Sequence, residues 1–387
     1  MNSKFLKALL LFGLMSLLLC GCNKVDNGEG ILHHAPEPTH ITENLEAGLQ
    51  VDLDVLSPGG EVPKLYRIEI PPLDASVVDA FLAQEGDAEA EVRDDLMLDD
   101  IHIYNAKTKT GGIVGYWRST EDSGQPVYSF SYSRPEFQEY TDVLRDYYGL
   151  DASMELNDTT ALYTEPREFS FCSYAEAEAK ATACLQSLGV RDLKLEAAYY
   201  IDHEIMNRYI RSEEAQRLLK DSPEREQGQE KQWDASVDAY YFHFTLEKDQ
   251  IPVLQNSFQN TTTDFMATTI RLLLNSSGIV YLSAENVFCF GDVYETPQSM
   301  ADYSAVLERV KRVAQNTLTE TERLLDGVQL QYACVQNGKE WLRVPVWVVT
   351  IRNRDALNYT DTYTGEEFTQ DTHTLFLFDA ITGKQIG

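Results

Sequence analysis

The pattern of apolar and polar residues predicts a chain built largely from β-strands. From Leu49 to Val55 every second residue is apolar, which is the spacing of a strand with one buried face. Similar alternation, or a short apolar run bounded by turn residues, recurs along the rest of the chain. It predicts further strands over 65–70, 101–104, 112–117, 127–132, 167–172, 193–201, 237–246, 251–254, 267–274, 279–290, 328–335, 342–351 and 374–378.

Helical spacing interrupts these strands at several places. Ser173 and Glu176 have the spacing of a capping box, in which each side chain bonds the other residue's free backbone N–H. Asn337-Gly338 is a strong hairpin signal between two of the strands. The acidic stretch 87–100 is expected to be a solvated loop or helix face. Helices are predicted over 74–83, 135–148, 174–188, 203–220 and 300–318.

An aromatic strand that leads into a helix occurs three times, with the helices ending near residues 148, 188 and 318. Strands followed by a packing helix are typical of α+β folds, in which helices cover one face of an antiparallel sheet. We therefore expect an α+β protein with antiparallel sheets and helices packed on one face, arranged in two or three repeated units.

The start of the chain has the organisation of an export signal. Two lysines precede an apolar run over 8–19, which is too short to span a bilayer as a helix, since that takes roughly 20 residues. Leu19 and Gly21 then stand three and one positions before Cys22, as in the lipobox of bacterial lipoproteins. We expect residues 1–21 to be removed and Cys22 to carry a diacylglyceryl group, whose two acyl chains suffice for stable anchoring.

This modification would hold the protein on the outer face of the cell membrane, because no later stretch of roughly 18 uncharged apolar residues could form a spanning helix. Residues 22–46 are rich in Gly, Asn and Pro and are expected to be a flexible tether. An N-terminal α+β domain over 47–150 and a C-terminal α+β domain over 165–387 are expected to follow.

The net charge of −30 narrows the choice of partners. Nucleic-acid binding requires a basic surface and is therefore excluded. Anionic lipid headgroups also repel an acidic domain. The favoured interpretation is that the charge keeps a tethered domain soluble. Attraction of cations or of a basic partner is the alternative.

Catalytic motifs in the chain are incomplete. His203 and Glu204 begin like the zinc-protease motif, but Asn207 stands where that motif has its second histidine. His243 lies in an alternating strand and is expected to pack there. Gly-x-Ser-x-Gly, phosphate-loop and Gly-x-Gly-x-x-Gly motifs do not occur. No catalytic or cofactor-binding residue is therefore predicted.

Metal-ligand patterns are equally weak. His33, His34 and His40 lie in the expected tether, where nothing preorganises ligands, so they are expected to be incidental. The stretch 355–371 is rich in oxygen ligands but lacks the spacing of a calcium loop, and a solvated hairpin loop is favoured. No metal site is predicted.

Four cysteines follow Cys22, and buried free thiols are the favoured interpretation. Cys172 and Cys184 are separated by a predicted helical segment of about 16 Å. A disulfide needs Cα atoms within about 7 Å, so this pair is not expected. Cys289 and Cys334 lie on predicted strands, and whether they pair stays open.

The C-terminal part of the chain resembles a known group of proteins. Residues 325–351 and 375–387 are similar to the PepSY-like units of the YycH and YycI regulatory proteins and of related Gram-positive lipoproteins. Residues 239–258 and 276–285 are similar to the middle of such units. The resemblance covers roughly 168–387 and implies PepSY-like units with a regulatory role and no catalytic residues. The YycH and YycI proteins differ in having a transmembrane helix where this chain has a lipobox.

Together these features predict a non-enzymatic, lipid-anchored binding or regulatory module that acts on a protein partner at the cell envelope. One alternative is a substrate-binding lipoprotein of a transporter, which predicts two α/β lobes with parallel sheets. Another is an enzyme with an unfamiliar site, built from a deep pocket with buried carboxylates or a histidine such as His243.

Overall fold

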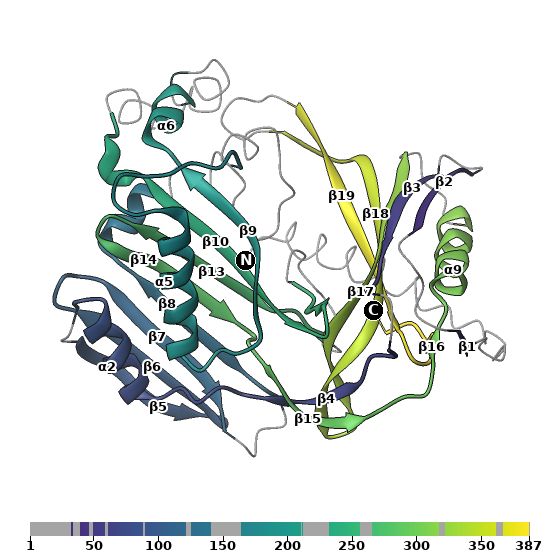
Figure 1. Cartoon of the computed structure of the whole chain (residues 1–387), viewed down its shortest axis with the longest axis horizontal. Helices are drawn as coiled ribbons and strands as arrows, with labels where there is room; N and C mark the ends of the chain where they lie inside the picture. The colour runs from purple at the N-terminus through teal and green to yellow at the C-terminus, as the bar shows by residue number, and fades with distance from the viewer. Residues whose placement is uncertain are drawn as a thin grey trace, which may run out of the picture. The chain divides into compact units, whose positions relative to one another are not determined.

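Two large β-sheets account for most of the computed structural model (Figure 1). Contacts divide the chain into a compact unit of Leu32–Gly387 and a separate unit of Met1–Ile31. All described residues belong to the larger unit. They are 32–33, 39–45, 49–58, 61–87, 90–120, 125–140, 164–209, 211, 232–255, 265–316, 322–360 and 367–386.

The first sheet has nine strands, all antiparallel to their neighbours. Their order is β11-β10-β13-β14-β8-β7-β6-β5, with β9 also paired to β10. The strands are β5 (Ala90–Leu98), β6 (Ile101–Thr108), β7 (Ile113–Ser119), β8 (Tyr128–Ser133), β9 (Leu193–Ile201), β10 (Ala239–Lys248), β11 (Ile251–Pro252), β13 (Thr269–Asn275) and β14 (Gly278–Glu285).

The second sheet has eight strands in the order β15-β4-β18-β17-β3-β2, with β12 on β17 and β19 on β18. A separate two-stranded pair joins β1 (Leu32–His33) to β16 (Met300–Ala301). The eight strands are β2 (Thr39–Asn44), β3 (Leu49–Leu56), β4 (Leu65–Glu69), β12 (Phe265–Met266), β15 (Cys289–Glu295), β17 (Arg323–Asn337), β18 (Glu340–Thr360) and β19 (Glu367–Asp379).

The local predictions for β3 and for the hairpin at Asn337-Gly338 are confirmed. Along β3 buried and exposed residues alternate without a break. β17 and β18 form the hairpin, and Gly338 has φ +67° at the first of its two central positions, where type II′ turns favour glycine. Alternation and turn chemistry therefore identified these strands correctly.

Helices α2 (Ala75–Gln84) and α5 (Tyr174–Ser187) lie over one face of the nine-stranded sheet (Figure 1). Phe81 of α2 packs edge-on against Phe130 and Tyr132 of β8. The predicted capping box at the start of α5 is confirmed, because Ser173 and Glu176 bond each other's backbone N–H.

The remaining short elements lie elsewhere. Helix α9 (Tyr303–Asn316) contacts the eight-stranded sheet, where Tyr303 packs against Trp347. Helix α6 (His203–Tyr209) follows β9. Two 3-10 helices are also present: η1 (Pro135–Phe137) follows β8, and η2 (Ala235–Val237) precedes β10. None of the described helices is both long and apolar enough to cross a membrane.

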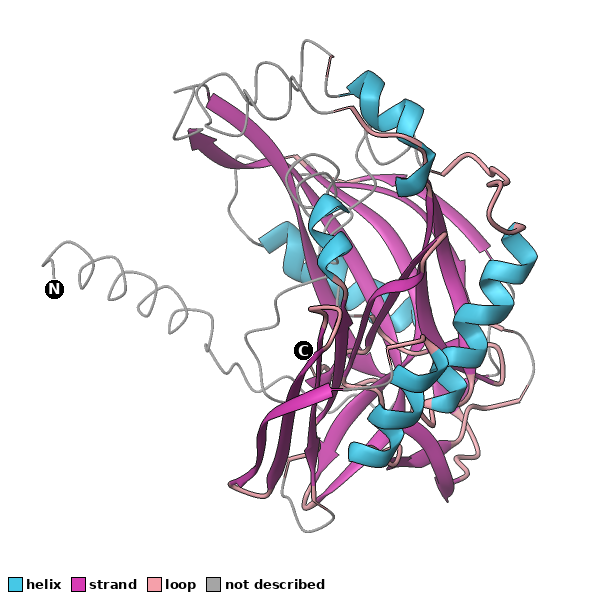
Figure 2. Ribbon diagram, turned by 90° about the vertical axis from the view of Figure 1, so that its left-hand side faces the viewer, coloured by secondary structure: helices cyan, strands magenta, loops and turns pink. Residues whose placement is uncertain are grey.

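The expected α+β fold, with helices packed on one face in two or three PepSY-like units, is wrong. Strands make up 54% of the described residues and helices only 20%, and the strands form two large sheets (Figure 2). β3 pairs with β17 in parallel, although the two strands are far apart in the sequence. Apolar alternation specifies which face of a strand is buried, but it does not specify which strand lies beside it.

The single long strand expected over 279–290 is also wrong. The chain forms β14 in one sheet, breaks at Asn286, where φ is +51°, and continues as β15 in the other sheet. Buried Arg343 of β18 holds this crossover, since its Nε and Nη2 donate to the carbonyl oxygen of Phe288 at 3.1 and 2.5 Å.

Three other segments differ from expectation. Residues 167–172 contain only an isolated bridge between Phe169 and Cys172. The acidic stretch within 87–100 forms edge strand β5 and a tight turn to β6. Part of the expected tether, residues 39–44, is strand β2.

Candidate functional site

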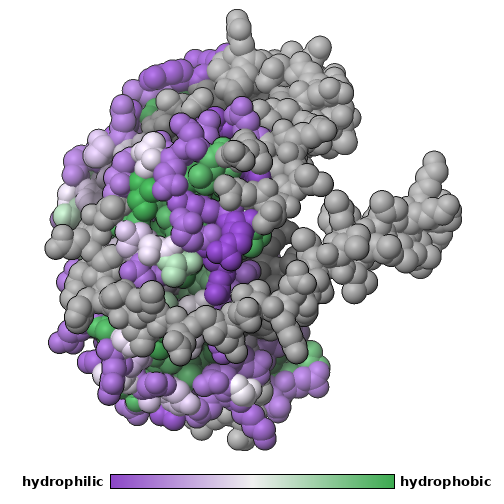
Figure 3. Space-filling model, turned by 90° about the vertical axis from the view of Figure 1, so that its right-hand side faces the viewer, coloured by the Kyte–Doolittle hydropathy of each residue, from purple (hydrophilic) through white to green (hydrophobic). Residues whose placement is uncertain are grey.

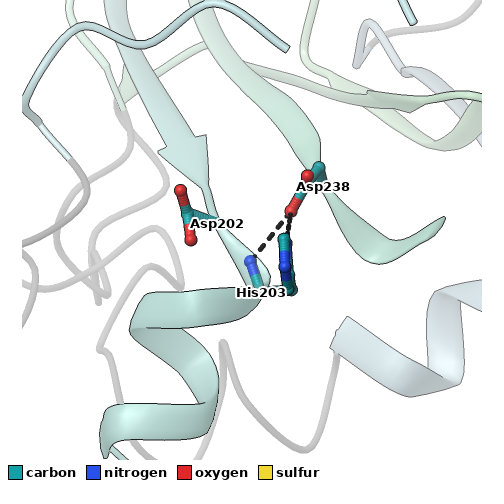
Figure 4. Close-up of side chains that lie close together, drawn as sticks. All are labelled: Asp202, His203 and Asp238. Carbon is teal, nitrogen blue, oxygen red and sulfur yellow. Dashed lines mark hydrogen bonds and ion pairs between the residues drawn. The ribbon is translucent and has the colours of Figure 1, made fainter. Parts of the chain in front are cut away.

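Two carboxylates and an imidazole meet where β9 ends and β10 begins (Figure 4). Ile201 of β9 pairs with Ala239 of β10. The residues just beyond this pair, Asp202 and His203 on one side and Asp238 on the other, are therefore adjacent. We call these three residues the Asp202 cluster.

Asp202 begins helix α6. Its Oδ1 accepts hydrogen bonds from the backbone N–H groups of Glu204 and Ile205, at 2.7 and 3.2 Å. This arrangement is that of an N-cap, which satisfies backbone donors that have no partner inside the helix. Its Oδ2 accepts from Nη1 of Arg167 at 2.8 Å. Both carboxylate oxygens are thus used by the fold.

His203 forms a pair with Asp238. The imidazole Nδ1 and the backbone N–H of His203 both donate to Oδ1 of Asp238, at 2.7 and 2.9 Å. Partial burial opposes the charged imidazole. The hydrogen bond to Asp238 and the negative charges of Asp238, Asp202 and Glu204 outweigh this effect and raise the pKa of His203.

The Asp202 cluster is the one group among the described residues whose ligand atoms lie close enough to hold a metal, within 4.8 Å of one another. A cation would have to displace the N-cap bonds of Asp202, the Nδ1 bond of His203 and the ion pair with Arg167. The guanidinium of Arg167 would also repel it. These contacts favour a structural role, in which the cluster ties α6 to the start of β10.

A histidine oriented by a carboxylate can also act as a general base if a nucleophile lies within hydrogen-bond reach of its other nitrogen. His203 lines an open cavity of about 610 Å³ together with Asn207, Arg208, Trp233 and Asp234. Within the described part of the chain, no hydroxyl or thiol bonds to Nε2 of His203.

A second candidate is an exposed apolar surface at the end of the nine-stranded sheet. Cross-strand pairing places Leu96 of β5, Ile103 of β6 and Trp117 of β7 in one row. Leu98 and Ile113 lie on the same face by the alternation of their strands. Leu96, Leu98, Ile113 and Trp117 are 42–59% exposed. We call these five residues the β5 surface; it lies on the sheet face opposite α2.

Acidic side chains outnumber basic ones along β5 and its turn to β6, and Lys107 of β6 lies cross-strand from both Glu91 and Ile113. β5 is the last strand of its sheet among the described residues, so one of its edges has no strand partner there. Asp99 and Asp100 form the turn to β6, and both have positive φ, as the central residues of a type I′ turn do. The acidic residues of this strand and turn are Glu91, Asp94, Asp95, Asp99 and Asp100, with Arg93 as the basic one.

Another side of the molecule differs from the β5 surface in the hydropathy of its described residues. Figure 3 shows a largely hydrophilic face with smaller, separate hydrophobic areas. Contiguous exposed apolar area on a soluble domain is uncommon and marks interaction sites. The sequence offered a signal for the β5 surface, since the run Leu96-Met97-Leu98 stands within the acidic stretch.

The residues singled out from the sequence are dispersed. Cys22, His34 and residues 361–366 lie outside the described residues. His40 bonds the carboxylate of Asp54 at 2.9 Å on β2 and β3 and is well exposed. His243 is half-buried in β10 with its Nε2 inaccessible to solvent, and burial and the charge of Arg271 lower its pKa to about 3.

The four described cysteines are free thiols. Burial is the leading cause that raises the pKa of each, to about 11 for Cys334. Since the thiolate is the nucleophilic form, these side chains are poor nucleophiles.

Comparison with known proteins supports the fold alone. No family model and no curated protein matches the chain. Among solved structures, the chain is similar to the crystal structure of an uncharacterised protein from Eubacterium rectale, with a TM-score of 0.57 and 15% sequence identity. The match covers 90% of this chain and 94% of that one.

Proposed function

We propose that the protein is a lipid-anchored, non-enzymatic binding module that engages a protein partner on the outer face of the cell membrane. The observation that carries this proposal is the β5 surface, which combines exposed apolar side chains with a strand edge that has no strand partner among the described residues. An exposed edge of this kind is a template for strand addition, in which main-chain hydrogen bonds give affinity and alternate side chains give specificity.

Charge complementarity defines the partner. The carboxylates along β5 and its turn favour a segment that carries Lys or Arg next to apolar side chains. Such a segment would place its apolar side chains against Leu96 and Trp117 and its basic side chains near Asp94, which lies on the same face of β5 as Leu96. The acidic charge excludes nucleic acid as the partner.

Membrane attachment rests on the lipobox at Cys22. We expect Cys22→Ser to move the protein from the membrane fraction to the soluble fraction of the producing cells, and a variant that remains in the membrane fraction would contradict lipid anchoring. The Asp202 cluster supports the non-enzymatic part, because both carboxylate oxygens of Asp202 and Nδ1 of His203 are engaged in bonds that hold the fold.

The partner can be identified by photo-crosslinking in intact cells, with p-benzoylphenylalanine placed at Trp117 and, as a control, at partly exposed Glu178 of α5. We expect one dominant envelope protein from position 117 and none from position 178. The capture should be lost with Leu96→Glu and retained with Val293→Glu, since Val293 is a similarly exposed apolar residue on β15. Identical protein sets from positions 117 and 178 would overturn the proposal.

A further inference from the structure

A cavity of about 380 Å³ lies where strands of the two sheets approach each other. Its floor belongs to the eight-stranded sheet and its opposite wall to β9 and the segment after β11. We call it the bulge cavity. Its lining residues are Asp54, Leu56, Glu196, Pro252, Val253, Leu254, Gln255, Asp326, Gly327, Val328, Gln329, Gln331, Val348, Thr350 and Leu375.

Two β-bulges aim carboxylates at this cavity. In β17 the ladder to β18 skips from Leu325 to Gly327 while β18 continues from Ile351 to Thr350, which leaves Asp326 as the extra residue. In β9 the ladder to β10 skips from Leu195 to Ala197, which leaves Glu196 as the extra residue. Bulges redirect a side chain out of the regular alternation and occur often beside binding sites. Both extra residues here line the same cavity.

Three polar atoms of the cavity residues are buried without a hydrogen-bond partner. They are Oδ1 of Asp326, Oε1 of Gln331 and Nε2 of Gln255. The other oxygen of Asp326 accepts from Nε of Arg352 at 3.1 Å, which fixes the carboxylate. Buried polar groups are nearly always paired, so three unpaired ones around one cavity indicate a ligand that supplies both donors and an acceptor.

The rest of the cavity is small and partly apolar. Gly327 pairs across the sheet with Thr350, and a Cβ added to it would meet only Thr350, at 3.6 Å or more. The absence of a side chain at this position therefore leaves room above the floor. Val328 and Val348 supply apolar walls on either side. The volume suits a small organic group, because ligand sites in proteins begin at roughly 300 Å³.

The charge of the cavity decides the class of ligand. Asp54, Glu196 and Asp326 line it, and the described lining residues include no Lys, Arg or His. Arg352 lies outside the lining and balances the charge of Asp326, so the excess negative charge at the cavity comes from Asp54 and Glu196. We propose that the bulge cavity binds an ammonium or guanidinium group carried on a short aliphatic chain, with a carbonyl close to that chain. The cation would donate to Asp326 and Gln331, the aliphatic chain would contact the valines, and the carbonyl would accept from Gln255.

This chemistry belongs to a free basic amino-acid derivative and equally to a lysine or arginine side chain of a peptide. Three compounds serve as probes. Nα-acetyl-lysinamide represents the free derivative and acetyl-Gly-Lys-Gly-amide represents the peptide. Nα-acetyl-norleucinamide has the same aliphatic chain without the ammonium. The site is distinct from the β5 surface in every residue, so either proposal can fail without the other.

Binding to the full-length chain in detergent can be followed by isothermal titration calorimetry at pH 7. We expect Nα-acetyl-lysinamide to bind and Nα-acetyl-norleucinamide to bind at least tenfold more weakly. Equal affinity for the two compounds would overturn the proposal. Binding of the tripeptide with the affinity of Nα-acetyl-lysinamide or better would identify a peptide ligand, and loss of binding to the tripeptide would identify a free one.

Two variants localise the binding. Asp326→Asn keeps the shape of the side chain and is expected to weaken binding of Nα-acetyl-lysinamide at least tenfold, whereas Asp292→Asn, an exposed control on β15, should leave it unchanged. Gly327→Val should abolish binding by filling the floor, and a valine suits a strand, so the variant is expected to fold. Unchanged binding in both Asp326→Asn and Gly327→Val would place the ligand elsewhere and overturn the proposal.

Discussion

The Asp202 cluster and the bulge cavity both gather carboxylates, yet their polar atoms are used in opposite ways. In the cluster, Asp202 accepts from backbone donors and from Arg167, and Asp238 accepts from His203. In the cavity, Asp326 and Gln255 each keep a buried atom without a partner. Leaving a buried polar group unpaired costs about 1–3 kcal/mol. The difference separates side chains that hold the fold from side chains that are available to a ligand.

The largest expected effect comes from breaking the satisfied cluster. Asp202→Ala should lower the free energy of unfolding by about 2 kcal/mol, because it removes the N-cap of α6 as well as a pair with Arg167, which is 32% exposed. Asp326→Ala should cost about 1 kcal/mol or less, since Arg352 is 37% exposed and can be hydrated. Urea unfolding of both variants checks the contrast, and equal losses would contradict it.

His243 is a further side chain with an unpaired buried atom among the described residues, its Nε2, and it can also titrate. Its folded pKa is about 3, whereas an unfolded histidine titrates near 6.5. The unfolded chain therefore binds this proton first, and stability is lost as the pH falls from about 6.5 towards 3. The expected loss between pH 7 and pH 5 is about 2 kcal/mol. Urea unfolding of His243→Phe should show a smaller loss over the same range, and an unchanged loss would exclude His243 as its source.

Gln255→Leu tests whether an unpaired polar atom of the bulge cavity lowers the stability of the fold. It replaces an amide whose Nε2 is buried and has no partner among the described residues with an apolar side chain of similar size, so we expect a gain in stability of about 1 kcal/mol. The same change should weaken binding of Nα-acetyl-lysinamide. Thermal unfolding and calorimetry on one preparation measure both effects. A loss of stability would show that the amide has a structural role.

Local structure was predictable where a few neighbouring residues decide it. The alternation from Leu49 to Val55 predicted β3, and the spacing of Ser173 and Glu176 predicted the cap of α5. Strand pairing was not predictable, because one buried face fits many partners. The break at Asn286 was missed for a related reason: the apolar run continues through it although the chain changes sheets there.

The candidate sites were harder to predict than the strands. The Asp-Gly step at 326–327 interrupts the apolar alternation, and a glycine inside a strand often marks a bulge, so the sequence did contain that signal. Glu196 gave none, since alanines follow it and the alternation fades without a turn residue. His203 and Glu204 were recognised only as an incomplete zinc motif. Their relation to Asp238 depends on the pairing of β9 with β10.

His203 gives the smallest effect and the opposite pH dependence to His243. Its folded pKa is raised, so the folded protein holds this proton more tightly than the unfolded chain does. The resulting stabilisation is complete below the unfolded pKa of about 6.5 and is lost as the pH rises through the folded pKa. In wild-type protein the urea midpoint should therefore include a component that falls between pH 6 and pH 8. His203→Gln should lack that component, because glutamine can occupy the site but carries no proton to lose. If both proteins show the same slope over this range, the pair with Asp238 contributes no pH-dependent stability, and the bonds of Asp202 alone hold α6 to the sheet.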